Sequence, residues 1–203
     1  MYSAFVLDDS YQGLMPFMDE ETKEIHYRIY LKNLQILNQL LKDTNYHYQY
    51  SLRDLIDHIS IFHLSVRGEI LYYLSSVLNH DLFFYSISNQ KNINPIGKLK
   101  EDILKHFQTY ENFKEEFKKS AMNLKGSGYT FLVLEENGKL KIINTSNEDS
   151  PYYYGMIPIM ILDLWEHAYF LKYKDNREEY IDNFFKVLDF QKLNQYYEGI
   201  LKK

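Results

Sequence analysis

The segment Asp163-Leu-Trp-Glu-His167 follows an apolar run, Met156 to Leu162, that is rich in isoleucine and methionine. Such a run predicts a buried strand, and the polar chain after it predicts where the strand ends. Asp163 and His167 place a carboxylate and an imidazole four residues apart at that point. Functional side chains often lie where a regular element gives way to a loop, so this pair is a candidate two-ligand unit for a metal ion.

The chain before this run also has the pattern of strands. After Gly126-Ser-Gly128 come Tyr129 to Leu134, a turn at Glu136-Asn-Gly138 and a second apolar run, Leu140 to Ile143. Two β-rich runs joined by an Asn-Gly turn are typical of a β-hairpin. Together with the run that ends at Leu162, they predict a small sheet of three strands.

The first half of the chain has a helical period instead. Between residues 19 and 88 apolar side chains recur at spacings of three and four, which predicts two or three long helices. They include Ile25, Ile29, Leu34, Leu37, Leu41, Leu52, Leu55, Ile56 and Ile59. Helical periodicity returns from Lys98 to Leu124, with a break at residues 108–110, and again from Arg177 to Tyr197.

Helices first and a small sheet second predict an α+β protein of two subdomains. The polar segment 89–97 contains both proline and glycine and is the best candidate for a linker. We place the boundary there, so that residues 1–90 form a helical domain and residues 91–203 an α/β domain.

Composition excludes several classes of protein. The 203 residues are 45% hydrophobic and 17% aromatic, which is enough for a large core. Cysteine is absent, so disulfides, thiolate metal ligands and cysteine nucleophiles are excluded, and any metal must be held by nitrogen and oxygen. A net charge of -5, with lysines interleaved among glutamates, argues against a nucleic-acid binder. We find no apolar run of bilayer length and no signal-peptide pattern, and we therefore expect a cytoplasmic protein that does not bind membranes.

Two further histidines are candidate ligands. His26 lies near the beginning of the helical half and His80 near its end, and on antiparallel helices the two can meet. Three imidazoles and one carboxylate suit iron, manganese or zinc by ligand type. The alternative is that each histidine caps a helix or packs in the core, which is the reading we prefer for His47, His58, His63 and His106.

Four separated stretches, spread over almost the whole chain, resemble the iron/manganese superoxide dismutases. The Asp-x-Trp-Glu-His-Ala core of the last stretch is highly specific, and the order of the four matches the family. They are Tyr11-Gln-Gly-Leu-Met-Pro16 through Glu24-Ile-His-Tyr27, Asn79-His80 with the aromatic residues after it, Phe113-Lys-Glu-Glu-Phe117 through Gly126-Ser-Gly128, and Asp163-Leu-Trp-Glu-His-Ala-Tyr169.

The resemblance implies an N-terminal helical hairpin followed by a C-terminal α/β domain with a small three-stranded antiparallel sheet. By similarity His26 and His80 are metal ligands from the hairpin, Asp163 and His167 are ligands from the α/β domain, and one manganese or iron ion lies between the two. The implied reaction converts superoxide into dioxygen and hydrogen peroxide. The family also implies a homodimer in which Glu166 reaches across the interface toward the second copy.

The four ligands match the family, but the chain departs from it at Glu148. Manganese-type members have a glutamine there, and iron-type members have one four residues before the second histidine, where this chain has Ser76. A carboxylate near the ion favours its trivalent state, which leans the metal slightly toward manganese. Alternatively Glu148 is protonated and imitates the amide, or it ligates the ion, or it is a solvent-facing loop residue.

The gateway tyrosine of the family also has no clear counterpart. If local motif decides the register it is Tyr30, with a helical turn missing, and if total length decides, Leu34 takes its place. The histidine that the family has after its first ligand is absent, and Phe170 replaces the tyrosine that would pair with that histidine across the dimer. Around the site, aromatic residues are expected at Phe84, Tyr129, Phe131 and Trp165.

We therefore predict a superoxide dismutase in which Tyr30, Glu148 and Trp165 assist the reaction. The changes at Glu148 and Ser76 support a second hypothesis, a metal-binding homologue with altered or little dismutase activity. A third hypothesis, a purely structural homologue, has little support because such a scaffold has no chemical need for four retained ligands.

Overall fold

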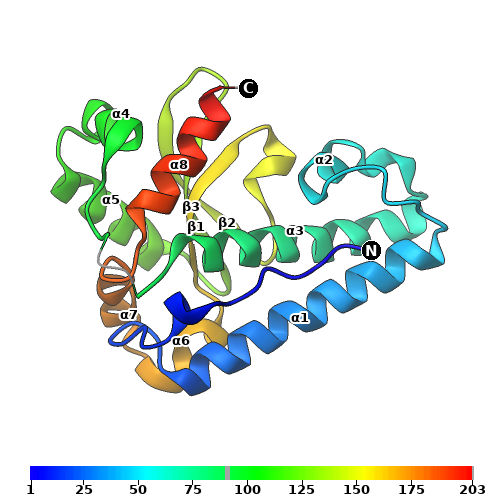
Figure 1. Cartoon of the computed structure of the whole chain (residues 1–203), viewed down its shortest axis with the longest axis horizontal. Helices are drawn as coiled ribbons and strands as arrows, with labels where there is room; N and C mark the ends of the chain where they lie inside the picture. Colours follow the sequence, from blue (N-terminus) through cyan, green and yellow to red (C-terminus); the bar gives the residue numbers. More distant parts are fainter. Residues whose placement is uncertain (90–91, 203) are drawn as a thin grey trace.

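The N-terminal half is built on two long antiparallel helices, α1 (Glu20–Asp43) and α3 (Leu64–Ser86), which pack along each other (Figure 1). The computed structural model describes residues 1–89 and 92–202. A short helix, α2 (Leu52–Asp57), and a 3₁₀ turn, η2 (Ile59–Ile61), connect the two long helices. The domain boundary expected between residues 90 and 91 lies outside the described residues.

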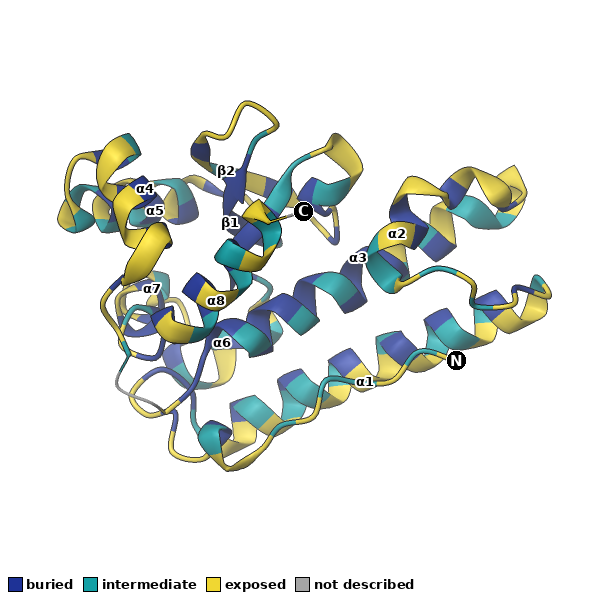
Figure 2. Cartoon of the chain, turned by 45° about the horizontal axis from the view of Figure 1, so that its top comes forward, coloured by how far each residue is buried: buried dark blue, intermediate teal, exposed yellow. Residues whose placement is uncertain are grey.

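Helix α1 is amphipathic, and its apolar stripe decides how it packs. Asp19 caps its N-terminus by accepting a hydrogen bond from the Thr22 amide at 2.9 Å, and two glutamates in the first turn complement the helix dipole. One face is buried and the opposite face is exposed (Figure 2). The buried residues, spaced three and four apart, are Thr22, His26, Tyr30, Leu34, Leu37 and Leu41.

Helix α3 is buried over most of its last four turns because it lies between α1 and the sheet. Its buried positions include the polar side chains of Ser76, Asn79 and His80. Buried polar groups need partners, so a polar segment inside an otherwise apolar helix indicates a structural or functional network.

The N-terminal segment, residues 1–8, runs along the two long helices (Figure 1). Asn38 holds its beginning, accepting from the Tyr2 amide at 2.9 Å and donating to the Tyr2 carbonyl at 3.0 Å. Further along, the hydroxyl of Tyr27 donates to the Phe5 carbonyl at 2.7 Å. A 3₁₀ turn, η1 (Asp9–Tyr11), follows this segment.

The second half contains the expected three-stranded antiparallel sheet. Helices α4 (Gly97–Phe107) and α5 (Tyr110–Asn123) precede it, and the break between them lies where the sequence predicts it. The strands β1 (Gly128–Leu134), β2 (Leu140–Ser146) and β3 (Ile157–Asp163) are arranged in the order β2-β1-β3, with Tyr129 of β1 opposite Asp163 of β3.

Three helices follow the sheet: α6 (Glu166–Tyr173), α7 (Arg177–Phe184) and α8 (Phe190–Leu201). The prediction of helix from Arg177 to Tyr197 is confirmed for most of this range, but residues 185–189 divide it into two helices. There Leu188 forms a β-bridge with Ile87, and Asp189 caps α8 by accepting hydrogen bonds from the amides of Gln191 and Lys192.

Before β3, a 3₁₀ turn, η3 (Pro151–Tyr154), packs near α2. Gly128 begins β1 so close to β2 that a Cβ atom there would overlap the carbonyl oxygen of Thr145, and its own carbonyl accepts from the Leu164 amide at 2.9 Å. This contact holds the end of β3 against the start of β1.

None of the helices within the described ranges is both long enough and apolar enough to cross a bilayer.

Candidate metal site

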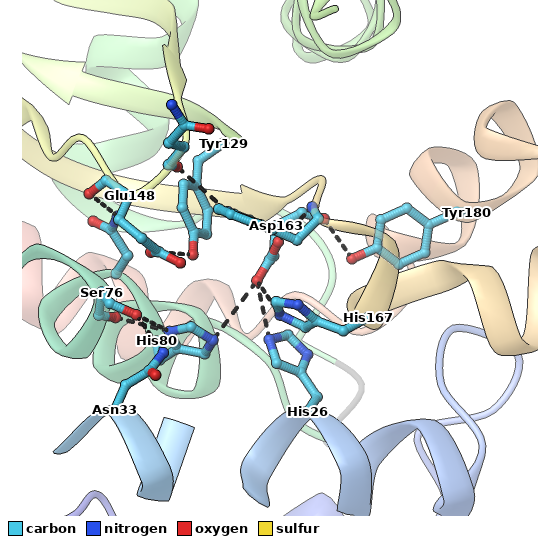
Figure 3. A network of polar contacts seen from close by, with 12 residues as sticks. His26, Asn33, Ser76, His80, Tyr129, Glu148, Asp163, His167 and Tyr180 are labelled. Atoms are coloured by element: carbon cyan, nitrogen blue, oxygen red, sulfur yellow. Dashed lines mark hydrogen bonds and ion pairs between the residues drawn. The ribbon is translucent and has the colours of Figure 1, made fainter. Parts of the chain in front are cut away.

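Four side chains from four different elements converge at the junction of the two halves. His26, His80, Asp163 and His167 each present one ligand atom, and these atoms all lie within 4.8 Å of one another (Figure 3). Oδ2 of Asp163 is at their centre, 3.0 Å from Nε2 of His26, 3.4 Å from Nε2 of His167 and 3.9 Å from Nε2 of His80. His26, His80 and Asp163 are fully buried, and only His167 has a partly exposed side chain.

Each ligand is placed by the end or the buried face of its element. His26 lies on the buried stripe of α1 and His80 on the buried part of α3. Asp163 is the last residue of β3, and His167 lies in the first turn of α6. The sequence predicts the end of the strand correctly but not the helix after it.

Asp163 is oriented by contacts that leave one oxygen free for the site. Its Oδ1 accepts a hydrogen bond from the Trp165 amide at 2.8 Å, and its backbone carbonyl accepts one from the Tyr180 hydroxyl at 2.8 Å. The contact with Trp165 turns the chain from β3 into α6. Oδ2 is therefore directed at the three imidazoles.

The imidazoles suit a metal ion because their Nε2 atoms can offer a lone pair to it. Nδ1 of His80 donates to the Ser76 carbonyl at 2.8 Å, which leaves a lone pair on Nε2. Nε2 of His80 and of His167 are buried without a hydrogen-bond partner among the described residues. Ligand atoms about 2.1 Å from one ion lie roughly 3 to 4 Å apart, so the donor set fits a nitrogen- and oxygen-ligated transition metal with little adjustment.

The electrostatics favour two neutral imidazoles around an ionised carboxylate. Burial lowers the pKa of His26, and burial together with the neighbouring His26 lowers the pKa of His80 to about 3. Burial acts to raise the pKa of Asp163, but His167 and His26 outweigh it and hold that pKa well below its usual range. Burial acts to lower the pKa of His167, yet the charge of Asp163 raises it overall.

Aromatic rings surround the imidazoles. The rings of Phe83 and Phe84 lie 4.7 and 5.2 Å from that of His26, and the Trp165 ring stacks on His167 at 6.0 Å. The sequence predicts Phe84 and Trp165 but not Phe83. These rings exclude water from the site, which strengthens every electrostatic interaction within it.

Glu148 lies next to this group, beside β1. It is only 4% exposed, and its Oε2 accepts a hydrogen bond from the Tyr129 hydroxyl at 2.7 Å (Figure 3). Its carbonyl accepts from Asn79 of α3 at 3.2 Å. Burial raises the pKa of Glu148 to about 7. The interpretation of Glu148 as a solvent-facing loop residue is therefore wrong.

Ser76 lies within the same network. Its hydroxyl accepts from the Asn33 side chain at 2.8 Å and lies 3.4 Å from Nδ1 of His80. Through its bond with Asn33, Ser76 thus links α1 to α3 one helical turn before the candidate ligand His80. Asn33 and Asn79 are contributors that the sequence analysis missed, since a single asparagine on a helix has no pattern that distinguishes it.

Tyr30 and Leu34 both lie on the buried stripe of α1, one helical turn apart. The Tyr30 ring stacks on His80 at 5.8 Å. Its hydroxyl donates to Oδ1 of Asp81 at 2.6 Å and accepts from the Phe5 amide at 2.6 Å. The hydroxyl of Tyr30 is therefore engaged on the side of the N-terminal segment.

Asp81 and Tyr180 are the other residues that the sequence analysis missed. Asp81 offers a signal in retrospect, because it is an acid next to His80 within an otherwise apolar segment. Burial raises its pKa to about 6. Tyr180 has no such signal in the sequence, because tyrosines are common in the buried faces of helices. Only the fold brings its hydroxyl to Asp163.

Comparison with known proteins points to one family. The profile of the iron/manganese superoxide dismutases, C-terminal domain, matches residues 95–196. A protein of Listeria ivanovii named superoxide dismutase [Mn] is 35% identical over 193 residues, which is 94% of each chain. Proteins of Listeria monocytogenes, named superoxide dismutase [Mn], and of Staphylococcus aureus, named superoxide dismutase [Mn/Fe] 2, are each 34% identical over 191 residues and 94% of each chain.

Proposed function

The chain belongs to the iron/manganese superoxide dismutase family, and from this we propose that it disproportionates superoxide to dioxygen and hydrogen peroxide at one manganese or iron ion. The observation that carries the proposal is the convergence of three imidazole nitrogens on Oδ2 of Asp163 in a buried, aromatic-lined site.

His26, His80, Asp163 and His167 would hold the ion. When bound, it supplies the one-electron oxidation and reduction of superoxide. Binding through Nε2 of His26 would require the ring proton that links His26 to Asp163 to move to Nδ1, and because protons compete with the ion for the imidazoles, binding would weaken as the pH falls. The hydrogen bond from His80 to Ser76 keeps the remaining ring proton away from the site.

Glu148 is proposed to hold a proton close to the site. Reduction of superoxide to hydrogen peroxide consumes protons, and burial, which raises the pKa of Glu148 to about 7 in the metal-free protein, favours a protonated carboxyl there. Since Oε2 accepts from Tyr129, Oε1 is the oxygen available to carry the proton toward another acceptor. In that state the side chain can act as a donor, as an amide would.

Trp165 and Tyr30 are proposed as positioning residues for the imidazoles. The Trp165 ring covers the partly exposed side of His167, and its amide holds Asp163. The Tyr30 ring covers His80, while its hydroxyl is held by Asp81 and Phe5. We therefore propose that Tyr30 keeps His80 in place and does not act as a gateway residue.

We also propose that the protein forms a homodimer through α6. We further propose that it is cytoplasmic. Glu166, at the first turn of α6, is exposed beside His167, and Phe170 and Leu171 on the same helix are 48% and 40% exposed. Large apolar side chains exposed together are typical of an interface. Cell fractionation followed by immunodetection tests the location.

The activity is tested by loading metal-free protein separately with manganese and with iron, then measuring metal content and superoxide removal. We expect near one ion per chain, with superoxide removal by at least one form. Tight binding of both metals without superoxide removal would contradict the proposal. It would favour the second candidate, a metal-binding homologue of altered activity, which the carboxylate at Glu148 suggests.

A further inference from the structure

A second candidate site lies beside Asp81, the residue that accepts the hydrogen bond of the Tyr30 hydroxyl. It is a pocket of about 360 Å³ formed by the N-terminal segment, α3, η3 and α8. Its size falls in the range of pockets that bind small organic molecules. The lining residues are Ser3, Ala4, Phe5, Leu78, Asp81, Leu82, Tyr85, Tyr152 and Tyr196.

Asp81 is the acid in this pocket. Oδ1 accepts a hydrogen bond from Tyr30, and no lysine, arginine or histidine of residues 1–89 and 92–202 forms an ion pair with the carboxylate. The nearby Arg53 instead pairs with Asp57 at 2.8 Å and lies over the Tyr152 ring at 4.5 Å. A largely buried carboxylate without a cation is costly, and a cationic ligand would offset that cost.

The walls of the pocket are aromatic, and their hydroxyls form hydrogen bonds within the protein. The hydroxyls of Tyr152 and Tyr196 hydrogen-bond to each other at 2.9 Å, and that of Tyr85 donates to the Lys192 carbonyl at 3.1 Å. The rings of Tyr85 and Tyr196 meet edge to face at 5.9 Å. What these residues offer a ligand is therefore ring surface, which attracts both apolar groups and cations.

We propose that this pocket binds a small organic cation, with an ammonium group on the Asp81 carboxylate and an apolar body against the tyrosine rings. An anion such as superoxide would be repelled by the Asp81 carboxylate. The pocket is thus a second site with a ligand of opposite charge to the substrate of the metal site.

The proposal is tested by isothermal titration of the metal-loaded protein at pH 8 with benzylamine and with its neutral analogue benzyl alcohol. We expect benzylamine to bind one per chain and at least about tenfold more tightly than the alcohol. Equal affinity for both compounds, or no heat from benzylamine at millimolar concentrations and above, would overturn it.

Two variants locate the site. Asp81→Asn keeps an acceptor for Tyr30 and removes the charge, and Ala4→Trp fills the pocket from the N-terminal segment without changing a residue of α3. Each is expected to weaken benzylamine binding at least about tenfold, while Asp43→Asn, an exposed acid at the end of α1, leaves it unchanged. Metal content is measured in parallel, because Asp81 adjoins His80. Unchanged binding in Ala4→Trp, or in an Asp81→Asn protein of normal metal content, would contradict the assignment.

Discussion

Glu148 is a single buried carboxylate whose charge the surrounding residues do little to compensate. The Tyr129 hydroxyl donates to it, but burial dominates and raises its pKa from 4.5 to about 7. The folded protein therefore holds this proton more tightly than the unfolded chain does. Its contribution to stability is complete below pH 4.5 and is lost as the pH rises through 7.

Glu148→Gln should remove this pH dependence from the metal-free protein. The shift in pKa corresponds to about 3 kcal/mol, so the variant should gain up to that amount over the parent above pH 8 and much less at pH 5. Urea unfolding of both proteins at the two pH values measures the difference. A gain of the same size at both would show that the charge of Glu148 is not the cause.

At the scale of elements, the two long helices and the N-terminal segment are joined through one hydroxyl. Tyr30 of α1 donates to Asp81 of α3 and accepts from the amide of Phe5. Tyr27, one residue after His26, makes a simpler contact, in which its hydroxyl donates to the Phe5 carbonyl. The two tyrosines form a matched pair.

Tyr30→Phe should reduce the free energy of unfolding by about 1 to 3 kcal/mol, because it leaves the carboxylate of Asp81 and an amide without their partner. Tyr27→Phe should have the smaller effect, since it removes one bond at a partly exposed carbonyl. Metal content should stay normal in both, because the Tyr30 ring that covers His80 is retained. Chemical denaturation and elemental analysis provide the test, and equal losses of stability would count against the account.

Most elements follow from the pattern of the sequence, and the exceptions have physical reasons. Helix α1 is long and periodic, α3 is long and largely apolar, and the Asn-Gly turn between β1 and β2 is a strong local signal. Helix α6 is missed because eight residues, Glu166–Tyr173, are too few to show a period. The break before α8 depends on Leu188 meeting Ile87, a contact about one hundred residues distant in the chain that no local pattern reveals.

The same distinction holds in the site. Asp163 and His167 are recognisable because one short motif carries both, whereas His26 and His80 depend on the resemblance to known sequences. The burial of Glu148 and its bond to Tyr129 arise from the packing of a loop against α3 and β1, which the sequence does not reveal.

At the scale of the whole molecule, the candidate metal site joins the two halves, and α6 beside it exposes apolar surface. Phe170 is 48% exposed on that helix, and the proposed dimer would cover it. Phe170→Lys should therefore shift the protein toward monomer, because it would bury a charge without a partner in the interface.

Sedimentation velocity measures the effect on assembly. Leu64→Lys is the matched control, since Leu64 is 75% exposed at the start of α3, far along that helix from the metal site. The control should sediment as the parent does. A parent protein that sediments as a monomer, or a Phe170→Lys protein that remains dimeric, would exclude an interface through α6.

The measurement that tests the central claim most directly is the metal content of Asp163→Ala, purified from cells supplied with manganese and iron. Asp163 is the residue on which all three imidazoles converge, so the variant should retain almost no metal, whereas His47→Ala, which changes an exposed histidine of the helical half, should retain the metal content of the parent. Metal at the level of the parent in a folded Asp163→Ala protein would contradict the assignment of this site.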